Sequence, residues 1–275
     1  MTILISVFIM GITGLIFSLF LVYGNTKFHI EVDPKIEQVE KALPGANCSG
    51  CGYASCSMYA ESIVTKNEKI NKCVVGGDET TQKIASIMGI KAEKSIKKIA
   101  VVMCQGDLNL ASFIGKYQGV KDCAYAYFST TDTSKMCKYG CLGMGSCVSA
   151  CPFNAISIDK NIGIPIVDAS KCTGCGNCVE ACPRHLIELH PIDRDIFIYC
   201  KNHDPTLVAK NICKTACIAC GICVRNAQKD GNEIAIKLID NLAQINFDEY
   251  NKIKFEYGEK CPTGAYNKNK NVINK

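Results

Sequence analysis

The hydrophobic pattern of the chain opens with an apolar run that holds no charged side chain. The run extends from Ile3 to Tyr23 and is long enough to cross the hydrocarbon core of a bilayer as a helix. Tyr23 ends the run at a position suited to the membrane–water interface, where tyrosine is enriched. Lys27 is the first charged residue after the run. No basic segment precedes the run and no A-x-A cleavage site follows it, which favours a retained anchor over a cleaved signal peptide. The sequence thus predicts a transmembrane anchor over residues 1–26.

Shorter helix and strand patterns follow the anchor. Ile36, Val39 and Leu43 share one face of a predicted helix that ends before Pro44, and residues 55–66 favour a second short helix. The segments AISI and IGIPIV predict one strand hairpin, and EIAIKL and LAQINF predict another. KKIAVVMCQG and DIFIYCKNHD each indicate a buried strand that ends at a cysteine. We therefore expect an α+β protein made of several small domains.

Cysteine changes this picture most, because 20 of the 275 residues are cysteines. Disulfide scaffolds belong to short secreted chains, and structural zinc sites usually pair two C-x2-C units across an intervening stretch. Here three cysteines follow one another at two-residue intervals within single loops. This spacing is typical of 4Fe–4S clusters. Iron–sulfur clusters are therefore favoured over disulfides and zinc.

The formal net charge of +5 belongs to the chain without its cofactors. An oxidised 4Fe–4S cluster with four thiolates carries about −2, and bound ions belong in the charge count. Four such clusters would make the loaded protein mildly acidic. The sequence also lacks a basic patch with interleaved aromatic residues, so nucleic-acid binding is not predicted.

The first cysteine group lies in and after the segment LPGANCSGCGYASC. Four cysteines without a histidine fit a 4Fe–4S cluster, and structural zinc is the alternative. Residues 27–95 are therefore expected to form a small helical domain with one cluster. Its predicted ligands are Cys48, Cys51, Cys56 and Cys73.

The second group contains CTGCGNCVEACP, whose C-x2-C-x2-C-x3-C-P spacing is specific for a bacterial two-cluster ferredoxin. The loop upstream, CKYGCLGMGSCVSACP, is irregular, because Met144 stands where the middle cysteine belongs and Cys137 supplies a replacement. In two-cluster ferredoxins the fourth cysteine of each loop binds the other cluster. Residues 136–192 are therefore expected to be a two-cluster ferredoxin-like domain, and residues 96–135 a connecting segment with strand and helix. The two predicted ligand sets are Cys137, Cys141, Cys147 and Cys182, and Cys172, Cys175, Cys178 and Cys151.

The third group begins with CIACGICVRNAQ, in which Ala227 stands where the fourth cysteine of a ferredoxin loop belongs. Cys261-Pro262 has the form of a second loop ending, but the cysteines expected before it are replaced by Asn251, Lys254 and Tyr257. When the fourth cysteine of each loop binds the other loop's cluster, these replacements remove every ligand of one cluster and leave all four ligands of the other. Residues 193–275 are thus expected to be a degenerate ferredoxin-like domain with one cluster. Its predicted ligands are Cys217, Cys220, Cys223 and Cys261.

The cysteines outside these sets are Cys104, Cys123, Cys200 and Cys213. A free cysteine often acts as a small buried hydrophobe, and this interpretation is favoured for the first three. The alternative is that strands ending near each other bring these thiols to a further site. The segment CKTAC matches CKYGC and makes Cys213 a competitor for the third group, where we expect it to lie beside the cluster without binding it. Four clusters are predicted in all.

The anchor, CSGCGYASC followed by a distant cysteine, and the ferredoxin loops, in this order, resemble the B subunit of the Rnf complex. The resemblance covers nearly the whole chain, and the loops after residue 200 are similar to the longer, clostridial-type form. The family's first motif commonly reads G-Y-P-G-C where residues 52–56 read GYASC, a departure that spares the cysteines. The resemblance implies a subunit of an ion-translocating (Na+ or H+) ferredoxin:NAD+ oxidoreductase. It would take electrons from soluble ferredoxin and relay them to other membrane subunits.

The residues alone support a more modest conclusion of the same kind. The sequence has no G-x-G-x-x-G loop, no P-loop and no paired catalytic carboxylates, so neither a nicotinamide site nor catalytic residues are predicted. One-electron transfer beside a membrane is the predicted chemistry. We expect single-pass attachment to the cell membrane with the cluster domains on the cytoplasmic side, where thiols stay reduced. The alternatives are an iron–sulfur relay subunit of another membrane reductase or hydrogenase, and a zinc-stabilised cysteine-rich interaction module.

Overall fold

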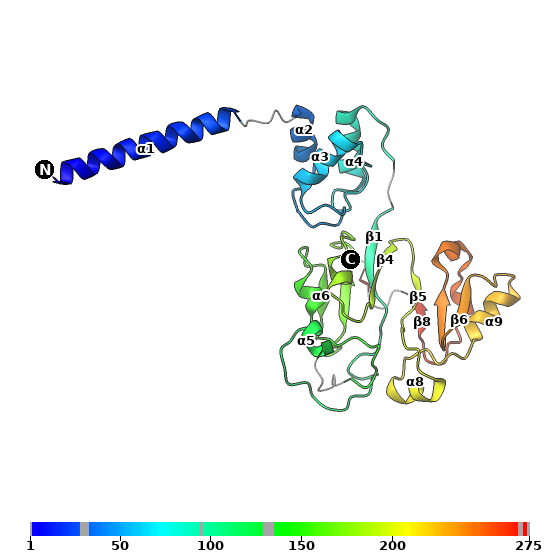
Figure 1. Ribbon diagram of the computed structural model, residues 1–275. Coiled ribbons are helices and arrows are strands. Elements are labelled where there is room, and N and C mark those ends of the chain that lie inside the picture. Colours follow the sequence, from blue (N-terminus) through cyan, green and yellow to red (C-terminus); the bar gives the residue numbers. More distant parts are fainter. Residues whose placement is uncertain (1, 28–32, 94–95, 129–134, 269–271, 274–275) are drawn as a thin grey trace.

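The computed structural model describes residues 2–27, 33–93, 96–128, 135–268 and 272–273. The first element is the long helix α1 (Thr2–Lys27). A small helical unit and two lobes built around short strands follow it (Figure 1). The described chain is thus a mixed helix and strand protein, as the sequence predicts.

Helix α1 contains one stretch, Ile5–Gly24, that is long and apolar enough to cross a membrane. None of this stretch is buried inside the protein. Two hydroxyl groups within it bond to the helix backbone: Thr13 Oγ1 donates to the carbonyl of Ile9 and Ser18 Oγ donates to that of Leu15, both at 2.9 Å. The polar side chains are therefore satisfied within the helix, which a lipid environment requires.

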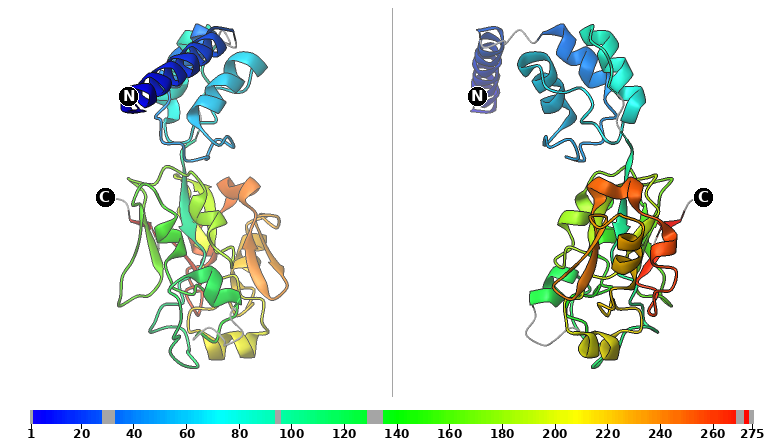
Figure 2. Two further views of the ribbon diagram at one scale, coloured as in Figure 1. Left: turned by 60° about the vertical axis from the view of Figure 1, so that its left-hand side comes forward. Right: turned by 90° about the vertical axis from the view of Figure 1, so that its right-hand side faces the viewer.

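The helical unit consists of α2 (Pro34–Ala42), α3 (Cys56–Lys66) and α4 (Gly77–Met88). The first two of these helices begin at side-chain caps, because Asp33 accepts a hydrogen bond from the N–H of Lys35 and Ser55 accepts one from that of Met58. Figure 2 shows this unit at one end of the two lobes in both views. The apolar faces of the three helices share a core that includes Val39, Tyr59, Ile63 and Ile84.

The first lobe begins and ends with paired strands. Its elements are β1 (Lys98–Val102), α5 (Cys123–Phe128), α6 (Ser146–Ser149), β2 (Ile156–Ile158), β3 (Pro165–Asp168), α7 (Asn177–Glu180) and β4 (Ile187–Pro191). Strand β1 pairs antiparallel with β4, with Val101 opposite Glu188, and β2 and β3 form the predicted hairpin. Residues from both sheets share one core that includes Val102, Val167 and Ile187.

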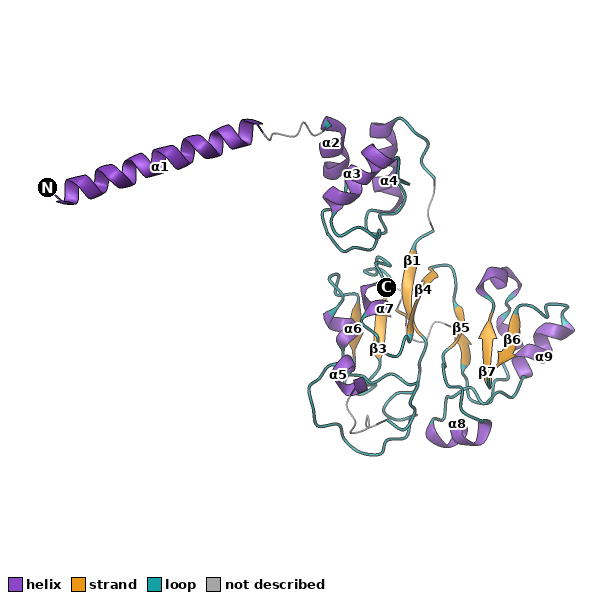
Figure 3. Cartoon of the chain, viewed as in Figure 1, coloured by secondary structure: helices purple, strands orange, loops and turns teal. Residues whose placement is uncertain are grey.

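The second lobe has strands in the same order. Its elements are β5 (Ile196–Ile198), α8 (Thr206–Ile212), α9 (Ile222–Lys229), β6 (Ile236–Ile239), β7 (Leu242–Ile245), the 3-10 helices η1 (Phe247–Lys252) and η2 (Phe255–Tyr257), and β8 (Tyr266–Lys268). Figure 3 shows strands β6 and β7 beside β5. Strand β5 pairs antiparallel with β8, and β6 and β7 form the second predicted hairpin. In each lobe, outer strands therefore enclose a hairpin, and each hairpin follows a cysteine loop.

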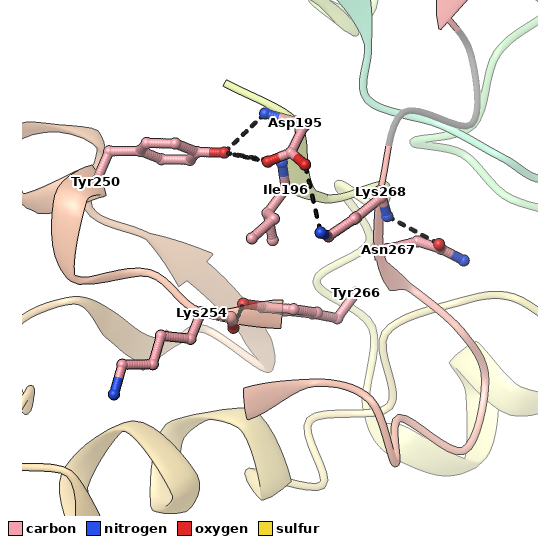
Figure 4. A network of polar contacts seen from close by, with 7 residues as sticks. All are labelled: Asp195, Ile196, Tyr250, Lys254, Tyr266, Asn267 and Lys268. Carbon is pink, nitrogen blue, oxygen red and sulfur yellow. Dashed lines mark hydrogen bonds and ion pairs between the residues drawn. The ribbon is translucent and has the colours of Figure 1, made fainter. Parts of the chain in front are cut away.

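A polar network holds the outer strands of the second lobe (Figure 4). The hydroxyl oxygen of Tyr250 accepts hydrogen bonds from the backbone N–H groups of Asp195 and Ile196, both at 2.8 Å. Lys268 on β8 forms an ion pair with Asp195 at 3.5 Å. The hydroxyl of Tyr266 donates to the carbonyl of Lys254 at 2.6 Å. These bonds attach η1 and η2 to the β5–β8 pair.

Strand pairing connects the segment before the first ferredoxin loops to the first lobe. Residues 96–135 are predicted to be a connecting segment with strand and helix, and β1 lies within it and pairs along its whole length with β4. The last four residues of β1 are buried, so this strand is part of the core of the first lobe. At the other end of the chain, β9 (Val272–Ile273) pairs in parallel with β3, which returns the chain to the first lobe. The predicted boundary at residue 95 lies outside the described residues.

Candidate iron–sulfur sites

The cysteines gather four at a time around five hollows, and all of them are free thiols. We name each site after one member. The Cys48 site has Cys48, Cys51, Cys56 and Cys73; the Cys172 site has Cys151, Cys172, Cys175 and Cys178; the Cys147 site has Cys123, Cys141, Cys147 and Cys182; the Cys217 site has Cys217, Cys220, Cys223 and Cys261; and the Cys104 site has Cys104, Cys137, Cys200 and Cys213. Together the five sites use each of the 20 cysteines once.

The geometry fits clusters better than single ions. Four thiols surround each hollow, at the Cys172 site as at the Cys217 site. Across the described residues, no three His, Cys, Asp or Glu side chains are placed to hold one metal ion. A zinc ion needs all four ligands at bonding distance from one atom, whereas a cubane of irons and sulfides binds thiolates that surround a larger volume. The donor sets therefore suit 4Fe–4S clusters.

The Cys48 site is formed by the loop before α3 and the turn before α4. The side chain of Asn47 accepts a hydrogen bond from the N–H of Cys56 at 2.8 Å, which folds the loop back on the start of α3. The N–H of Gly76 donates to Cys73 Sγ at 3.4 Å. Burial and the nearby Cys56 and Cys51 thiolates raise the pKa of Cys73. The structure thus brings together the four cysteines predicted for this region.

The Cys172 site also has the predicted members, including Cys151 from the other loop. The N–H groups of Ala100 and Ala155 donate to the Sγ atoms of Cys172 and Cys151, each at 3.4 Å. Gly174 has a φ of +74°, and a Cβ there would lie 2.5 Å from the carbonyl oxygen of Lys98. Glycine therefore lets this loop approach β1 closely.

The Cys147 site differs from the sequence prediction at one position. The structure places Cys123, not Cys137, around the hollow that Cys141, Cys147 and Cys182 line. Burial comes first among the causes that raise the pKa of Cys147 to about 12, and the Cys123 and Cys182 thiolates follow. Cys123 therefore lies beside Cys147 and supplies the fourth thiol at this hollow.

Two hydrogen bonds account for the position of Cys123 at the start of α5. The N–H of Cys123 donates to Ser146 Oγ at 2.7 Å, and that hydroxyl donates to Asp122 at 2.8 Å. These bonds fix the start of α5 against the start of α6, one residue before Cys147. The sequence around Cys123 has no cluster-binding spacing, because ferredoxin loops take three ligands from a single short segment.

The Cys217 site brings together the predicted members from the loop before α9 and the Cys-Pro segment before β8. Burial acts to raise the pKa of Cys261, but hydrogen bonds from the backbone of Tyr266 and Thr263 outweigh it and lower that pKa. Burial and the Cys217, Cys261 and Cys220 thiolates raise the pKa of Cys223 to about 12. As at the other sites, the role of these cysteines as ligands stays a prediction.

The second lobe lacks the ligands for a second cluster, and packed side chains occupy the positions where two of these ligands would lie. Ala227 is fully buried and Tyr257 is 3% exposed, and both belong to the same apolar core. Asn232 Nδ2 donates to the Tyr257 hydroxyl at 2.8 Å, and that hydroxyl donates to Asp230 at 3.1 Å. Side-chain packing and these hydrogen bonds stabilise this region of the lobe.

The fifth hollow lies where the two lobes meet. Ala111 in the first lobe forms an antiparallel bridge with Cys213 in the second, and the N–H of Ser112 donates to the carbonyl of Ile212 at 2.8 Å. Three of the four cysteines here, Cys104, Cys200 and Cys213, lay outside the ligand sets predicted from the sequence. The fourth is Cys137, which the sequence assigned to the Cys147 site. The sequence left open whether strand ends bring these thiols to a further site. In the structure Cys104, after β1, and Cys200, after β5, line the same hollow.

Comparison with known proteins adds the family. Residues 43–75 match the family of an Fe-S cluster domain, and residues 136–186 match the 4Fe-4S dicluster domain family. The B subunit of the Na(+)-translocating ferredoxin:NAD(+) oxidoreductase complex of Acetobacterium woodii is 42% identical, over 94% of this chain and 76% of that protein. The proton-translocating counterpart of Clostridium ljungdahlii is 37% identical over 96% of this chain and 92% of its own length. The B subunit of the ion-translocating oxidoreductase complex of Methanosarcina acetivorans is 35% identical, over 88% of this chain and 89% of that protein.

These matches cover 88–96% of the chain and confirm the resemblance found in the sequence. The chain therefore belongs to the family of Rnf complex B subunits, the B subunits of ion-translocating ferredoxin:NAD+ oxidoreductases.

Proposed function

We propose that this chain is the membrane-anchored iron–sulfur subunit that takes electrons from reduced ferredoxin and passes them to membrane partner subunits of an ion-translocating oxidoreductase. The observation that carries the proposal is the gathering of the cysteines into four-thiol sites that neighbour one another. When bound, a 4Fe–4S cluster takes up and releases one electron. The sites proposed to hold the four predicted clusters are the Cys48, Cys172, Cys147 and Cys217 sites.

The surroundings of the cysteines suit bound clusters. Backbone N–H groups donate to sulfur at 3.4 Å at Cys73, Cys151, Cys172 and Cys182. Such bonds stabilise negative charge on the sulfurs and are one means by which a protein sets the potential of its cluster. At the Cys172 site the hydroxyl oxygen of Thr173 is buried and has no hydrogen-bond partner among the described residues. A cluster sulfide would give this hydroxyl an acceptor.

Three of the sites follow one another in space. A Cβ on Gly50, in the loop of the Cys48 site, would lie 3.0 Å from the Cα of Cys175. This contact places the Cys48 site beside the Cys172 site. The pKa of Cys178 is raised to about 12, mainly by burial and then by neighbouring thiolates. Because the Cys147 thiolate is one of these, the Cys172 site adjoins the Cys147 site. Neighbouring sites are the arrangement that stepwise electron transfer needs.

The connection to α1 suggests the direction of transfer. The helical unit that holds the Cys48 site follows α1 directly in the chain, and only a short segment separates the end of α1 from Cys48. A residue spans at most about 3.5 Å, which limits how far this site can lie from the membrane. The Cys48 site is therefore the proposed point of transfer to the membrane subunits. The two lobes are proposed to receive electrons from ferredoxin on the cytoplasmic side.

The proposal is tested in membranes of a strain that lacks this chain, complemented with variants of it. The full chain should restore ferredoxin-dependent NAD+ reduction, whereas Cys48→Ala and Cys51→Ala should be present in the membrane yet restore little of it. Thr65→Ala, on the exposed side of α3 in the same unit, is the matched control and should restore the full rate. Full rates in both cysteine variants would contradict the proposed route through the Cys48 site.

A further inference from the structure

We propose that Cys104, Cys137, Cys200 and Cys213 bind an additional 4Fe–4S cluster at the junction of the two lobes. This site lies beyond the four clusters considered above. It rests on the placement of these four thiols and their surroundings, and not on the proposed electron donor.

The four cysteines are related in pairs by the repeat of the two lobes. Cys104 follows β1 and Cys200 follows β5, each two residues after the strand ends, and β1 and β5 are the first strands of their lobes. Cys137 and Cys213 each stand four positions before the first cysteine of the next loop, Cys141 or Cys217. Each lobe therefore contributes one cysteine from a strand end and one from the start of a cysteine loop. Such a matched set is expected of a shared site, and not of four unrelated buried thiols.

Two glycines show how closely the thiols approach. A Cβ on Gly106 would lie 3.1 Å from Cys213 Sγ and 3.9 Å from Cys104 Sγ, so thiols from different lobes meet at this glycine. A Cβ on Gly140 would lie 3.4 Å from Cys137 Sγ. Both glycines line the hollow. The absence of their side chains leaves the space in front of the sulfurs open.

The polar groups around this hollow suit a sulfur-rich ligand. The N–H of Asn202 donates to Cys200 Sγ at 3.4 Å. The side chain of Asn202 lines the hollow and is 1% exposed, and its Nδ2 has no hydrogen-bond partner within the described residues. A buried amide donor without an acceptor costs about 1–3 kcal/mol. A cluster sulfide or cysteine thiolate in the hollow would supply the acceptor.

Positive charge is buried around the same thiols. Lys135 is 7% exposed, lines the hollow, and donates through Nζ to the carbonyls of Gly106 and Cys141. Arg184 is half-buried, lines the neighbouring Cys147 hollow, and donates to the carbonyls of Cys137 and Gly140. Negative charge stabilises a buried cation. A 4Fe–4S cluster with four thiolates, which carries about −2, would place negative charge beside Lys135.

The thiols themselves interact as members of one site. Burial first, and then the thiolates of Cys104 and Cys213, raise the pKa of Cys137. Burial likewise raises the pKa of Cys200 to about 12, with smaller contributions from Cys217 and Cys104. This influence of the thiols on one another reflects their position around one hollow.

The site would also connect the Cys217 site to the others. The N–H of Cys141, at the Cys147 site, donates to Cys104 Sγ at 3.5 Å. On the other side, Cys200 is close enough to Cys217 for the Cys217 thiolate to raise its pKa. The Cys104 site thus lies between the Cys147 and Cys217 sites. With it, the five sites form one continuous series.

Iron and sulfide content of anaerobically purified full chain tests the proposal. Five clusters correspond to about 20 iron atoms per chain, whereas four correspond to about 16. The double variant Cys104→Ala/Cys213→Ala should lose about four irons, the content of one cluster, because both cysteines belong to the same site. Cys213→Ala combined with Cys261→Ala should lose about eight, because the two cysteines belong to different sites.

The comparison of the two double variants also controls for misfolding, since general unfolding would remove far more iron than one cluster. Spin quantification of the reduced proteins gives a second readout that does not depend on ferredoxin or NAD+. A wild-type chain with about 16 irons would overturn the proposal, and so would an unchanged iron content in Cys104→Ala/Cys213→Ala. Either result would leave the proposed electron-transfer function intact.

Discussion

The backbone N–H of Cys141 donates a hydrogen bond to the Sγ of Cys104 at 3.5 Å. The Cys141 side chain lines the Cys147 site, while Cys104 lines the site at the lobe junction. A single peptide group therefore separates two four-cysteine sites. Cys137 and Cys141, close together in the sequence, line these two neighbouring hollows.

The first prediction concerns the thiol that Cys123 contributes. Because Cys123 lines the Cys147 hollow, Cys123→Ala combined with Cys182→Ala should remove about one cluster, or four irons. Cys137→Ala combined with Cys182→Ala should remove about two, because Cys137 lines a different hollow. Iron and sulfide analysis of the two purified double variants provides the measurement. A loss of one cluster in both pairs would instead support the assignment made from sequence, in which Cys137 and Cys182 bind the same cluster and Cys123 binds none.

The second prediction concerns the anchor. Deletion of residues 1–27 removes α1 and should yield a chain that fractionates with soluble protein, since none of the apolar stretch packs against the rest. The deleted form should retain the iron content of the full chain. Ultracentrifugation after expression without partner subunits provides the measurement. A deleted chain that still sedimented with membranes would show that another part of the protein binds them.

The third prediction concerns the contact between the helical unit and the first lobe. Gly50→Ala places a methyl group 2.9 Å from Val74 Cγ2 and 3.0 Å from the Cα of Cys175, so the unit must move away from the Cys172 site. We expect full iron content but slower onward transfer to membrane subunits. Gly115→Ala has no atom within 4 Å of the new methyl and is the matched control. Equal rates in the two variants would show that this contact does not limit transfer.

The fourth prediction concerns stability of the second lobe. Tyr250→Phe removes the oxygen that accepts hydrogen bonds from the backbone of Asp195 and Ile196, and should destabilise the protein by about 1–3 kcal/mol. Tyr125→Phe is the control, because Tyr125 is 66% exposed and should change the free energy of unfolding little. Anaerobic denaturant unfolding, followed through the cluster absorbance, compares the two. Equal stability would mean that water replaces the lost acceptor.

Local spacing and apolar pattern were enough to predict much of this structure. The strand hairpins and the helices at residues 34–42 and 56–66 follow directly from periodicity and turn residues. The complementary loss of ligands in the second lobe predicted that Cys261 would join Cys217, and the structure places both at one hollow. These features depend on contacts within one ferredoxin repeat, and the repeat constrains them.

The Cys104 site and the role of Cys123 could not be obtained in the same way. Cys104 and Cys213 meet only because the two lobes pack together, and no local spacing records that packing. Cys123 reaches its hollow through hydrogen bonds between the starts of α5 and α6. The pairing of β1 with β4 likewise joins segments far apart in the chain, so the sequence predicted the strand in KKIAVVMCQG but not its partner in the first lobe.

The central claim is that this chain accepts electrons from reduced ferredoxin and holds them on its cluster sites. The most direct test is anaerobic stopped-flow mixing of the purified full chain with reduced ferredoxin, recorded at the broad iron–sulfur absorbance near ~400 nm. The account predicts rapid bleaching of this band in the wild type. It also predicts that Cys48→Ala bleaches as fast but with a smaller amplitude, because only the site proposed for onward transfer is lost. A chain that binds no iron, or a band that reduced ferredoxin leaves unchanged, would contradict the account.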